Sequence, residues 1–355
     1  MRLDTLGRIA PALFVIFGFT VSHRVCRGDE PGDKAGKADA APTKQGVERL
    51  QEEAAALKPL MKSGFTRKFL AGTADLPKID ERPLHVNPTM KQYYSARSFK
   101  KLSRDEQAAT QERSVGETIY YTTKYGSPLA YAGVLEVLAK HGAGDLSGKR
   151  LMDYGYGTVG HLRLLASAGV DAVGVDVDPL LTAIYSEPQD QGVMKSTSGT
   201  DGRVTLVDGQ WPGDPAVKKA VGGGYDVITS KNTLKNGFIH PERPVDKSRL
   251  VDLSVSDEAF VEALADALKP GGYVVIYNIC PPQSPPDQEY IPWADGRCPF
   301  PRKMWEKAGF EVLAFDEDDH AAMRAMGMGL GWDDGKGAAE LEKSYFAHYS
   351  LFRKK

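Results

Sequence analysis

Apolar and polar positions along residues 148–180 predict a strand, a turn, a helix and a second strand. An apolar run from Arg150 to Met152 leads to Asp153. An amphipathic run from His161 to Ala168 follows, and a second apolar run from Ala172 to Val175 ends in Asp176. The turn between the first strand and the helix is Gly155-Tyr156-Gly157-Thr158-Val159-Gly160. This succession is typical of the first half of a nucleotide-binding α/β sheet.

The turn has the residue types that a nucleotide-binding loop needs. Gly155 and Gly157 allow a tight turn and let the backbone approach a ligand, since they carry no Cβ. A helix beginning near Thr158 would point its free amides and the positive end of its dipole at the same place. Asp176 is placed to accept hydrogen bonds from both hydroxyls of a ribose. The spacing Gly155-x-Gly157-x-x-Gly160 also matches the dinucleotide-binding pattern.

Further strands and helices follow in an order that extends the sheet. Residues 203–207 form a short apolar run that ends in Asp208 and Gly209. A helix is predicted over 259–268, broken by Lys-Pro-Gly-Gly. The other predicted strands are Tyr225–Thr229, Tyr273–Tyr277, a segment entered through 305–313, and a final antiparallel strand within Ser344–Phe352.

Taken together, these segments resemble the class I S-adenosylmethionine-dependent methyltransferases. Asp153-x-Gly155-x-Gly157 resembles the first motif of that family, and the segment Leu-Lys-Pro-Gly-Gly-Tyr-Val-Val-Ile at 268–276 resembles its entry into the fifth strand. The resemblance covers residues 125–355. It implies a Rossmann-like, mainly parallel seven-stranded sheet with helices on both faces, an antiparallel last strand and the strand order 3-2-1-4-5-7-6. It also implies methyl transfer from S-adenosylmethionine.

The resemblance places the cofactor at the ends of four strands. Gly155 and Gly157 would cradle its methionine part, Asp176 would bind its ribose, and Val177 and Asp208 would meet its adenine. Asp178 is instead predicted to cap the next helix. The implied cofactor-binding residues are Asp153, Gly155, Tyr156, Gly157, Asp176, Val177, Asp208, Gly209 and Ser230.

Candidate catalytic residues follow the fourth strand, where this family places the transferred methyl group. Lys231 and Asn232 are the candidates there, and His240 in the following loop is a candidate base, with a solvated loop as the alternative. The segment lacks the Asn/Asp-Pro-Pro-aromatic motif of methyltransferases that act on amides or nucleobases. The acceptor is therefore predicted to be another small molecule or a protein side chain. His161, at the start of the first helix, is predicted to lie on its polar surface.

Two other functional classes remain open from the sequence. The dinucleotide pattern also allows an NAD-dependent oxidoreductase, although no dehydrogenase-like catalytic Lys or His motif follows. A non-catalytic S-adenosylmethionine-binding module is the other alternative. Val159 favours it, because many family members carry glycine at that position.

The composition of the chain limits which partners and metals it is predicted to bind. The chain of 355 residues carries 45 basic and 47 acidic side chains, which predicts no nucleic-acid partner. Its three cysteines show no metal-ligand spacing, so no metal site is predicted. Cys280 and Cys298 are predicted either to form a disulfide or to remain two free thiols. The methyl acceptor and the oligomeric state are not indicated.

The N-terminal part predicts three further segments. In residues 1–28, arginines flank the apolar stretch Ile9–Val21, which suggests a signal peptide or an anchor that contacts the membrane. Export conflicts with the cytoplasmic supply of S-adenosylmethionine, so a cytoplasmic location is the alternative. Residues 29–46 read as a flexible linker. Residues 47–125 are predicted to form a helical extension, with a capping box at Ser103 and Glu106, before the methyltransferase domain at 126–355.

Overall fold

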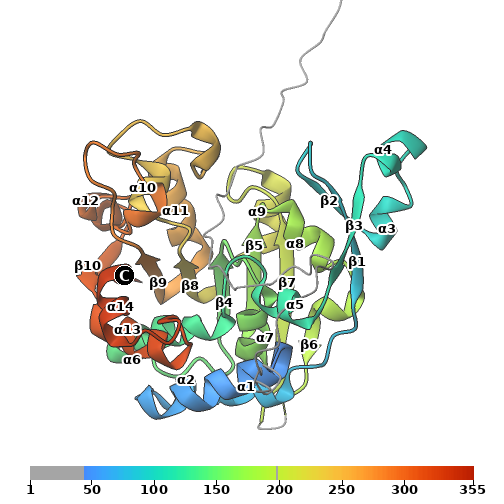
Figure 1. Ribbon diagram of the computed structural model, residues 1–355. Coiled ribbons are helices and arrows are strands. Elements are labelled where there is room, and N and C mark those ends of the chain that lie inside the picture. Colours follow the sequence, from blue (N-terminus) through green and yellow to red (C-terminus); the bar gives the residue numbers. More distant parts are fainter. Residues whose placement is uncertain (1–43, 197–198) are drawn as a thin grey trace, which may run out of the picture.

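The chain builds one central eight-stranded sheet in the order β10-β11-β9-β8-β4-β5-β7-β6. The computed structural model describes residues 44–196 and 199–355. Strands β7, β5, β4, β8 and β9 are parallel, and β11 runs antiparallel between β9 and β10 (Figure 1). The strands are β4 Arg150–Tyr154, β5 Asp171–Asp176, β6 Gly192–Met194, β7 Gly202–Asp208, β8 Tyr225–Lys231, β9 Leu268–Cys280, β10 Phe310–Asp318 and β11 Phe346–Lys354.

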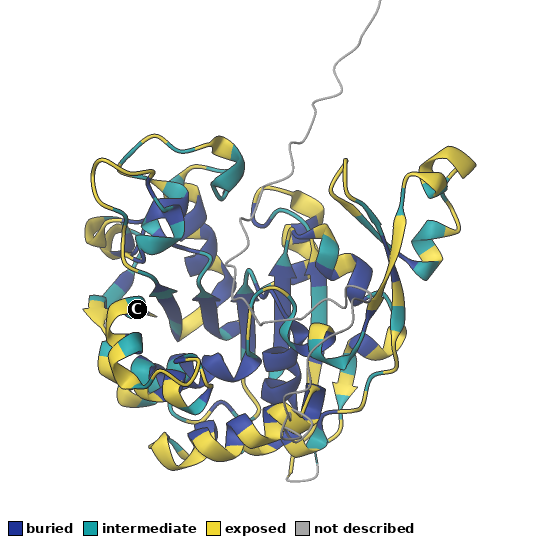
Figure 2. Ribbon diagram, in the orientation of Figure 1, coloured by how far each residue is buried: buried dark blue, intermediate teal, exposed yellow. Residues whose placement is uncertain are grey.

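Alternate residues of the central strands enter two separate cores, so these strands are mostly buried (Figure 2). Leu151 joins one core and its neighbour Met152 joins the other. The first core also takes residues of α1 Gly46–Leu57, α2 Gly64–Ala71, α6 Tyr131–Lys140, α7 Val159–Ser167 and α13 His320–Gly329. The second takes residues of α9 Pro215–Val221, α11 Asp257–Ala267 and α12 Arg302–Lys307. The sheet is thus covered on both faces, as predicted.

The predicted order 3-2-1-4-5-7-6 is confirmed, but the predicted number of seven strands is wrong by one. The additional strand is β6, a three-residue strand that pairs antiparallel with β7 at the sheet edge. Such a short segment carries too few positions for an alternation to be recognised in the sequence. The Lys-Pro-Gly-Gly break also differs from expectation, because it lies within β9 as an irregularity between the pairs Tyr225–Leu268 and Val227–Tyr273.

The predicted helical extension is only partly helical. Its second half contains a three-stranded antiparallel sheet, β2-β1-β3 (Figure 1). Leu84 belongs to the main core, whereas the adjacent His85 stacks on Phe99 with ring centroids 3.6 Å apart. Both faces of this small sheet are therefore covered, and its short strands gave no clear sequence signal. Its elements are β1 Arg82–Asn87, β2 Gln92–Ser95 and β3 Gln111–Val115, with α3 Ala96–Phe99 and α4 Arg104–Ala108.

Other local predictions are confirmed. Ser103 and Glu106 form the capping box that opens α4. Asp178 caps α8 by accepting the Leu180 amide. The remaining elements are α5 Glu117–Thr122, α8 Pro179–Ile184, α10 Asn236–Ile239 and α14 Ala338–Ser344, with short 3-10 turns at Lys58–Leu60, Gly72–Asp75, Pro128–Ala130, Pro188–Asp190, Lys247–Arg249 and Pro292–Ala294.

The predicted N-terminal signal or anchor segment, residues 1–28, lies outside the described residues, as does most of the predicted linker. Within 44–196 and 199–355, no helix has both the length and the apolar character needed to cross a membrane.

Candidate functional site

The glycine turn between β4 and α7 has the backbone geometry that the sequence predicts. Gly155 and Gly157 adopt φ values of 75° and 58°, in the left-handed region that favours glycine. The Gly155 amide donates to the Val175 carbonyl at 2.8 Å, and the Gly157 amide donates to the Asp176 carboxylate at 3.0 Å. The turn is therefore fixed to the end of β5, the strand that supplies the predicted ribose-binding carboxylate.

Asp176 is the centre of this carboxyl edge of the sheet. Its carboxylate also accepts the amides of Val177 and Asp178, at 2.8 and 3.0 Å. Burial raises the pKa of the Asp176 carboxyl to about 6, although these amides oppose the rise. Asp208 is its register partner on β7, so the two predicted acidic strand ends lie side by side. The Val177 side chain is 43% exposed, which leaves an apolar surface beside the carboxylate.

A segment of the extension lies directly on the glycine turn. The Thr123 hydroxyl donates to the Gly157 carbonyl at 2.8 Å, and the Tyr125 hydroxyl donates to Asp178 at 2.7 Å. Lys124 pairs with the same carboxylate at 2.7 Å. A Cβ added to Gly157 would lie 2.9 Å from the Tyr125 ring. Glycine is therefore required here by close packing as well as by its φ value.

The predicted cofactor residue Tyr156 and the nearby Val159 are both buried. The Tyr156 side chain is 6% exposed, and its ring packs in the first core. Val159, which replaces a common family glycine, is fully buried, and its amide donates to the Tyr185 hydroxyl at 3.2 Å. This position is therefore part of the packing at the start of α7. Gly209, also predicted, donates its amide to the Asp176 carbonyl at 2.9 Å.

Below the turn, Asp153 is the acceptor of a buried polar network. Its carboxylate is fully buried and accepts hydrogen bonds from the Tyr131 hydroxyl and, at 2.7 Å each, from Thr229 and the His161 ring. The His161 and Tyr131 rings stack with centroids 3.7 Å apart. Three donors from three elements thus hold one carboxylate under the turn. The implied cofactor-binding role of Asp153 stays a prediction.

The prediction that His161 lies on the polar surface of the first helix is wrong, because its side chain is fully buried. Side chains in the first turn of a helix lean towards its N-terminus, and this lean brings the ring onto the end of β4. Nε2 faces the carboxylate, and Nδ1 has no partner among the described residues. Burial lowers the pKa of His161, and the Asp153 carboxylate opposes the decrease. The contacts therefore fit a neutral ring with its proton on Nε2.

We expect acid to destabilise the protein through His161. Because its folded pKa lies below the unfolded value, its contribution to stability is complete above about pH 6.5 and is lost as the pH falls further. The unfolding free energy should decrease by at most about 1.4 kcal/mol per pH unit from this residue. Urea unfolding of the wild type and His161→Gln, which keeps an N–H donor, at pH 5 to 8 measures it. Parallel pH profiles for both proteins would contradict the prediction.

The end of β8 brings together the predicted residues Ser230, Lys231 and Asn232. The Ser230 hydroxyl donates to the Tyr154 carbonyl at 3.1 Å, and the Asn232 side-chain oxygen accepts the Ile279 amide at 2.7 Å. Asn232 has a φ of 65°, and its own amide donates to the Tyr277 carbonyl at 3.0 Å. Ser230 and Asn232 thereby fasten β8 to the strands on either side.

Lys231, between them, is directed to the buried network. Its Nζ lies 5.5 Å from the centroid of the Tyr131 ring. Burial lowers the pKa of Lys231 to about 8, and the charge of Asp153 limits the decrease. An amine with such a pKa can release and take up a proton near neutral pH.

His240 lies elsewhere. It follows α10 and its Nε2 is 2.7 Å from the Asp257 carboxylate in the first turn of α11, with a side chain that is 47% exposed. The structure therefore places this candidate base in a surface pair, and its proposed catalytic role stays a prediction.

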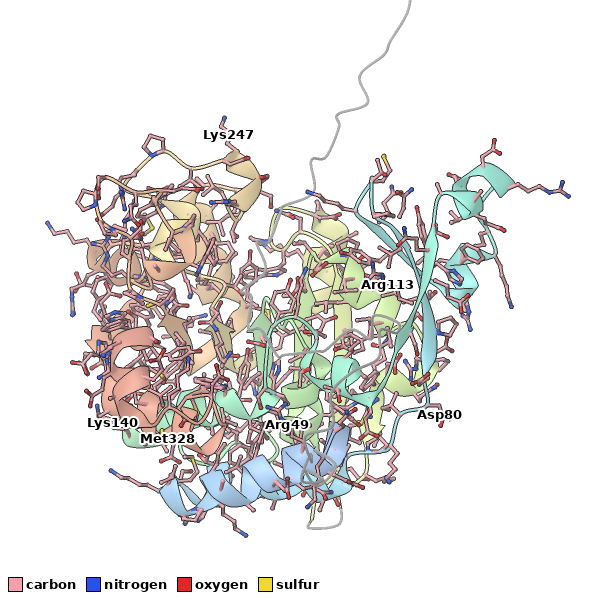
Figure 3. The ribbon with its side chains drawn as sticks, in the orientation of Figure 1. Arg49, Asp80, Arg113, Lys140, Lys247 and Met328 are labelled. Atoms are coloured by element: carbon pink, nitrogen blue, oxygen red, sulfur yellow. The ribbon has the colours of Figure 1, made fainter. Side chains whose placement is uncertain are left out.

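The sequence analysis did not identify Lys235, whose amine holds together the loops that follow β8 and β9. Its Nζ donates to the carbonyls of Ile279 and Trp293, at 2.6 and 2.9 Å. Burial also lowers the pKa of Lys235 to about 8. Arg243 binds four backbone carbonyls within 284–288. These contacts join the loops 236–256 and 281–300 into one lobe, and Lys247 points outward from its top (Figure 3).

The lobe faces the β1–β2 hairpin of the extension across the carboxyl edge of the sheet (Figure 1). Lys91, at the hairpin tip, is near enough to the lobe for its charge to help lower the pKa of Asp246, after the contacts of Asp246 with Ser248. Cys280 and Cys298 are both buried free thiols, so the alternative of a disulfide is not realised in this structure.

The comparisons with known proteins identify the family of the chain. Residues 127–314, just over half of the chain, match a family model described as a methyltransferase domain. No curated protein matched the chain.

Several solved structures are similar at low identity. The [4+2]-cyclase SpnF is 15% identical, with coverage of 88% of this chain and 97% of that chain and a TM-score of 0.38. Magnesium protoporphyrin IX methyltransferase from Synechocystis PCC 6803, with bound S-adenosylmethionine, is 17% identical, with coverage of 64% and 79% and a TM-score of 0.33. A methyltransferase from Mesorhizobium loti is 13% identical, with coverage of 63% and 98% and a TM-score of 0.38. These values are too low to support any inference about activity.

Proposed function

The chain belongs to the class I S-adenosylmethionine-dependent methyltransferases, and from this premise we propose that it methylates a small molecule whose nucleophilic atom first loses a proton to Lys231. The family match decides against the NAD-dependent oxidoreductase. The observation that supports the proposed acceptor class most directly is the partly buried Lys231 amine at the end of β8, 5.5 Å from the centroid of the Tyr131 ring and with a pKa lowered to about 8.

The residues present fit the cofactor. Gly155 and Gly157 have the left-handed backbone that allows close approach, and Asp176 and Asp208 are register partners at adjacent strand ends. Val177 offers an exposed apolar side chain for the adenine. S-adenosylmethionine, when bound, supplies a methyl group on an activated sulfonium leaving group. The protein's own part is to hold the acceptor, exclude water and move a proton.

Lys231 is suited to the proton transfer. The side chain is partly buried, and the loss of solvent favours its neutral form more than in water. The neutral amine can take the proton of a phenol or other hydroxyl, or of an ammonium group, and the resulting ammonium is stabilised by Asp153 and by the face of the Tyr131 ring. Acceptors of this type need a base, unlike thioethers or tertiary amines.

The lobe formed by 236–256 and 281–300 and the β1–β2 hairpin stand on opposite sides of the carboxyl edge of the sheet (Figure 1). This arrangement supports a small molecule over a protein side chain, because a folded protein surface would have to fit between them to reach Lys231.

An acceptor screen tests this proposal. We expect the full chain with S-adenosylmethionine to release S-adenosylhomocysteine faster with members of a panel of phenols, aliphatic alcohols and primary amines. The same panel should contain thioethers and tertiary amines as acceptors without a proton to lose. Turnover confined to these last acceptors would contradict the role of Lys231, while the family assignment would stand.

A further inference from the structure

A cavity of about 390 Å³ lies between the extension and helices α7 and α8. Its walls come from residues 77–84, the β2–α3 junction, Val115, the segment 183–189 and Arg163 of α7. None of the residues predicted to bind cofactor or to catalyse lines it. Its volume is within the range of small-molecule sites.

Arg163 is the unusual residue in this wall. It is 4% exposed, and one of its amino groups donates to the Gln189 carbonyl at 2.6 Å. Its Nε has no hydrogen-bond partner, and among the described residues no carboxylate forms an ion pair with it. Buried charges in proteins are normally paired, since an unpaired one is costly to desolvate. The guanidinium therefore lacks an anion.

The buried carboxylate of Asp190, which is bonded to the Tyr120 hydroxyl beside Arg163, is already paired with another cation. Nη1 of Arg82 lies within hydrogen-bond distance of both carboxylate oxygens of Asp190, at 2.9 and 2.8 Å. The Tyr120 hydroxyl donates to the same carboxylate at 2.9 Å. The guanidinium carbons of Arg82 and Arg163 lie 5.1 and 5.5 Å from the same Tyr120 ring. Of these two guanidinium groups, only that of Arg82 pairs with a carboxylate among the described residues, and Arg163 is left without an anion.

The remaining lining determines which anion fits. Much of it is apolar, with Ile79, Leu84, Val115, Ala183 and Ile184 among the lining residues. Asp80, Glu81 and Glu187 also line the cavity, and Asp80 lies at the edge of the molecule (Figure 3). These acidic groups disfavour a multiply charged anion, whereas the apolar wall favours a hydrocarbon body.

We propose that this cavity binds a small amphipathic monocarboxylate, whose carboxylate pairs with Arg163 and whose hydrocarbon part packs on the apolar wall. A planar guanidinium matches a carboxylate with two parallel hydrogen bonds. The site is separate from the proposed cofactor and acceptor site.

Calorimetric titration of the full chain with octanoate at pH 7 tests the proposal. We expect saturable binding at one site, which is kept when S-adenosylhomocysteine is present at saturation. Octanamide, the neutral match, should bind at least about tenfold more weakly, and octyl phosphate should also bind more weakly than octanoate.

Two variants locate the site. Arg163→Met keeps the length of the side chain and removes the charge, and Ala96→Phe fills the cavity from the start of α3. Each should weaken octanoate binding by about tenfold or more. If Arg163→Met does not fold, Ala96→Phe alone decides. Absence of saturable octanoate binding, equal binding of octanamide, or undiminished affinity in the folded variants would overturn the proposal.

Discussion

Asp176→Ala is expected to weaken the binding of S-adenosylhomocysteine by at least about 100-fold. The variant removes the carboxylate that accepts the Gly157 amide, so the proposed ribose acceptor and the anchor of the glycine turn are lost together. Hydrogen bonds to a charged group contribute about 1.5–3 kcal/mol each, and about 1.4 kcal/mol corresponds to a tenfold change in affinity. Calorimetric titration of the full chain measures the effect.

A matched substitution separates the site from the strand. Asp171 lies at the other end of β5 and forms a surface pair with Arg150 at 3.2 Å, so Asp171→Ala should bind S-adenosylhomocysteine like the wild type. Equal affinity of Asp176→Ala and the wild type would remove Asp176 from the cofactor site and leave the family assignment unchanged.

The same residue should make cofactor binding pH-dependent. Because burial raises its pKa to about 6, Asp176 becomes protonated in the folded protein at mildly acidic pH. The affinity should therefore fall below pH 6, by about tenfold per pH unit if the ionised form alone binds. The folded-state pKa exceeds the unfolded value, so ionisation at pH 7 lowers stability, and Asp176→Asn should unfold at the wild-type temperature or above it.

The parts of the fold that the sequence predicted are those specified by local signals. The glycine turn requires left-handed backbone at Gly155 and Gly157, and glycine adopts this conformation at the lowest cost. The buried parallel strands appear as continuous apolar runs, because both of their faces are covered. The order of the strands came from the family resemblance and not from any property of a single strand.

The missed features depend on contacts between segments that are distant in the sequence. Tyr131, Asp153 and Thr229 come from three separate elements, and no spacing in the chain indicates that His161 joins them. A polar residue in the first turn of an amphipathic helix is normally exposed, and this expectation failed because the adjacent strand end carries a buried carboxylate. Similarly, Lys235 is buried only because two loops place carbonyls around its amine.

Lys231→Met is expected to lower kcat by about 100-fold to 10,000-fold with a proton-bearing acceptor, while the affinity for S-adenosylhomocysteine stays unchanged. Met retains the length and the apolar stem of the side chain but cannot take a proton. Lys231→Arg should be equally slow, because a guanidinium remains protonated at all relevant pH values. Steady-state kinetics with an acceptor from the screen, together with calorimetric titration, measure both quantities.

The pH dependence distinguishes a base from a residue that only attracts an anionic acceptor. With the pKa of Lys231 lowered to about 8, the fraction of neutral amine rises as the pH increases through 8, so kcat should increase and then level off. If Lys231 acted as a cation, activity would instead fall over the same range. Lys269 provides a control. It lies near the start of β9, far from the strand ends that form the site, and its half-exposed amine pairs with Asp226 at 2.9 Å, so Lys269→Met should retain the wild-type pH profile.

Small added amines should restore part of the activity of Lys231→Ala, because they can occupy the space and take the proton that the side chain no longer takes.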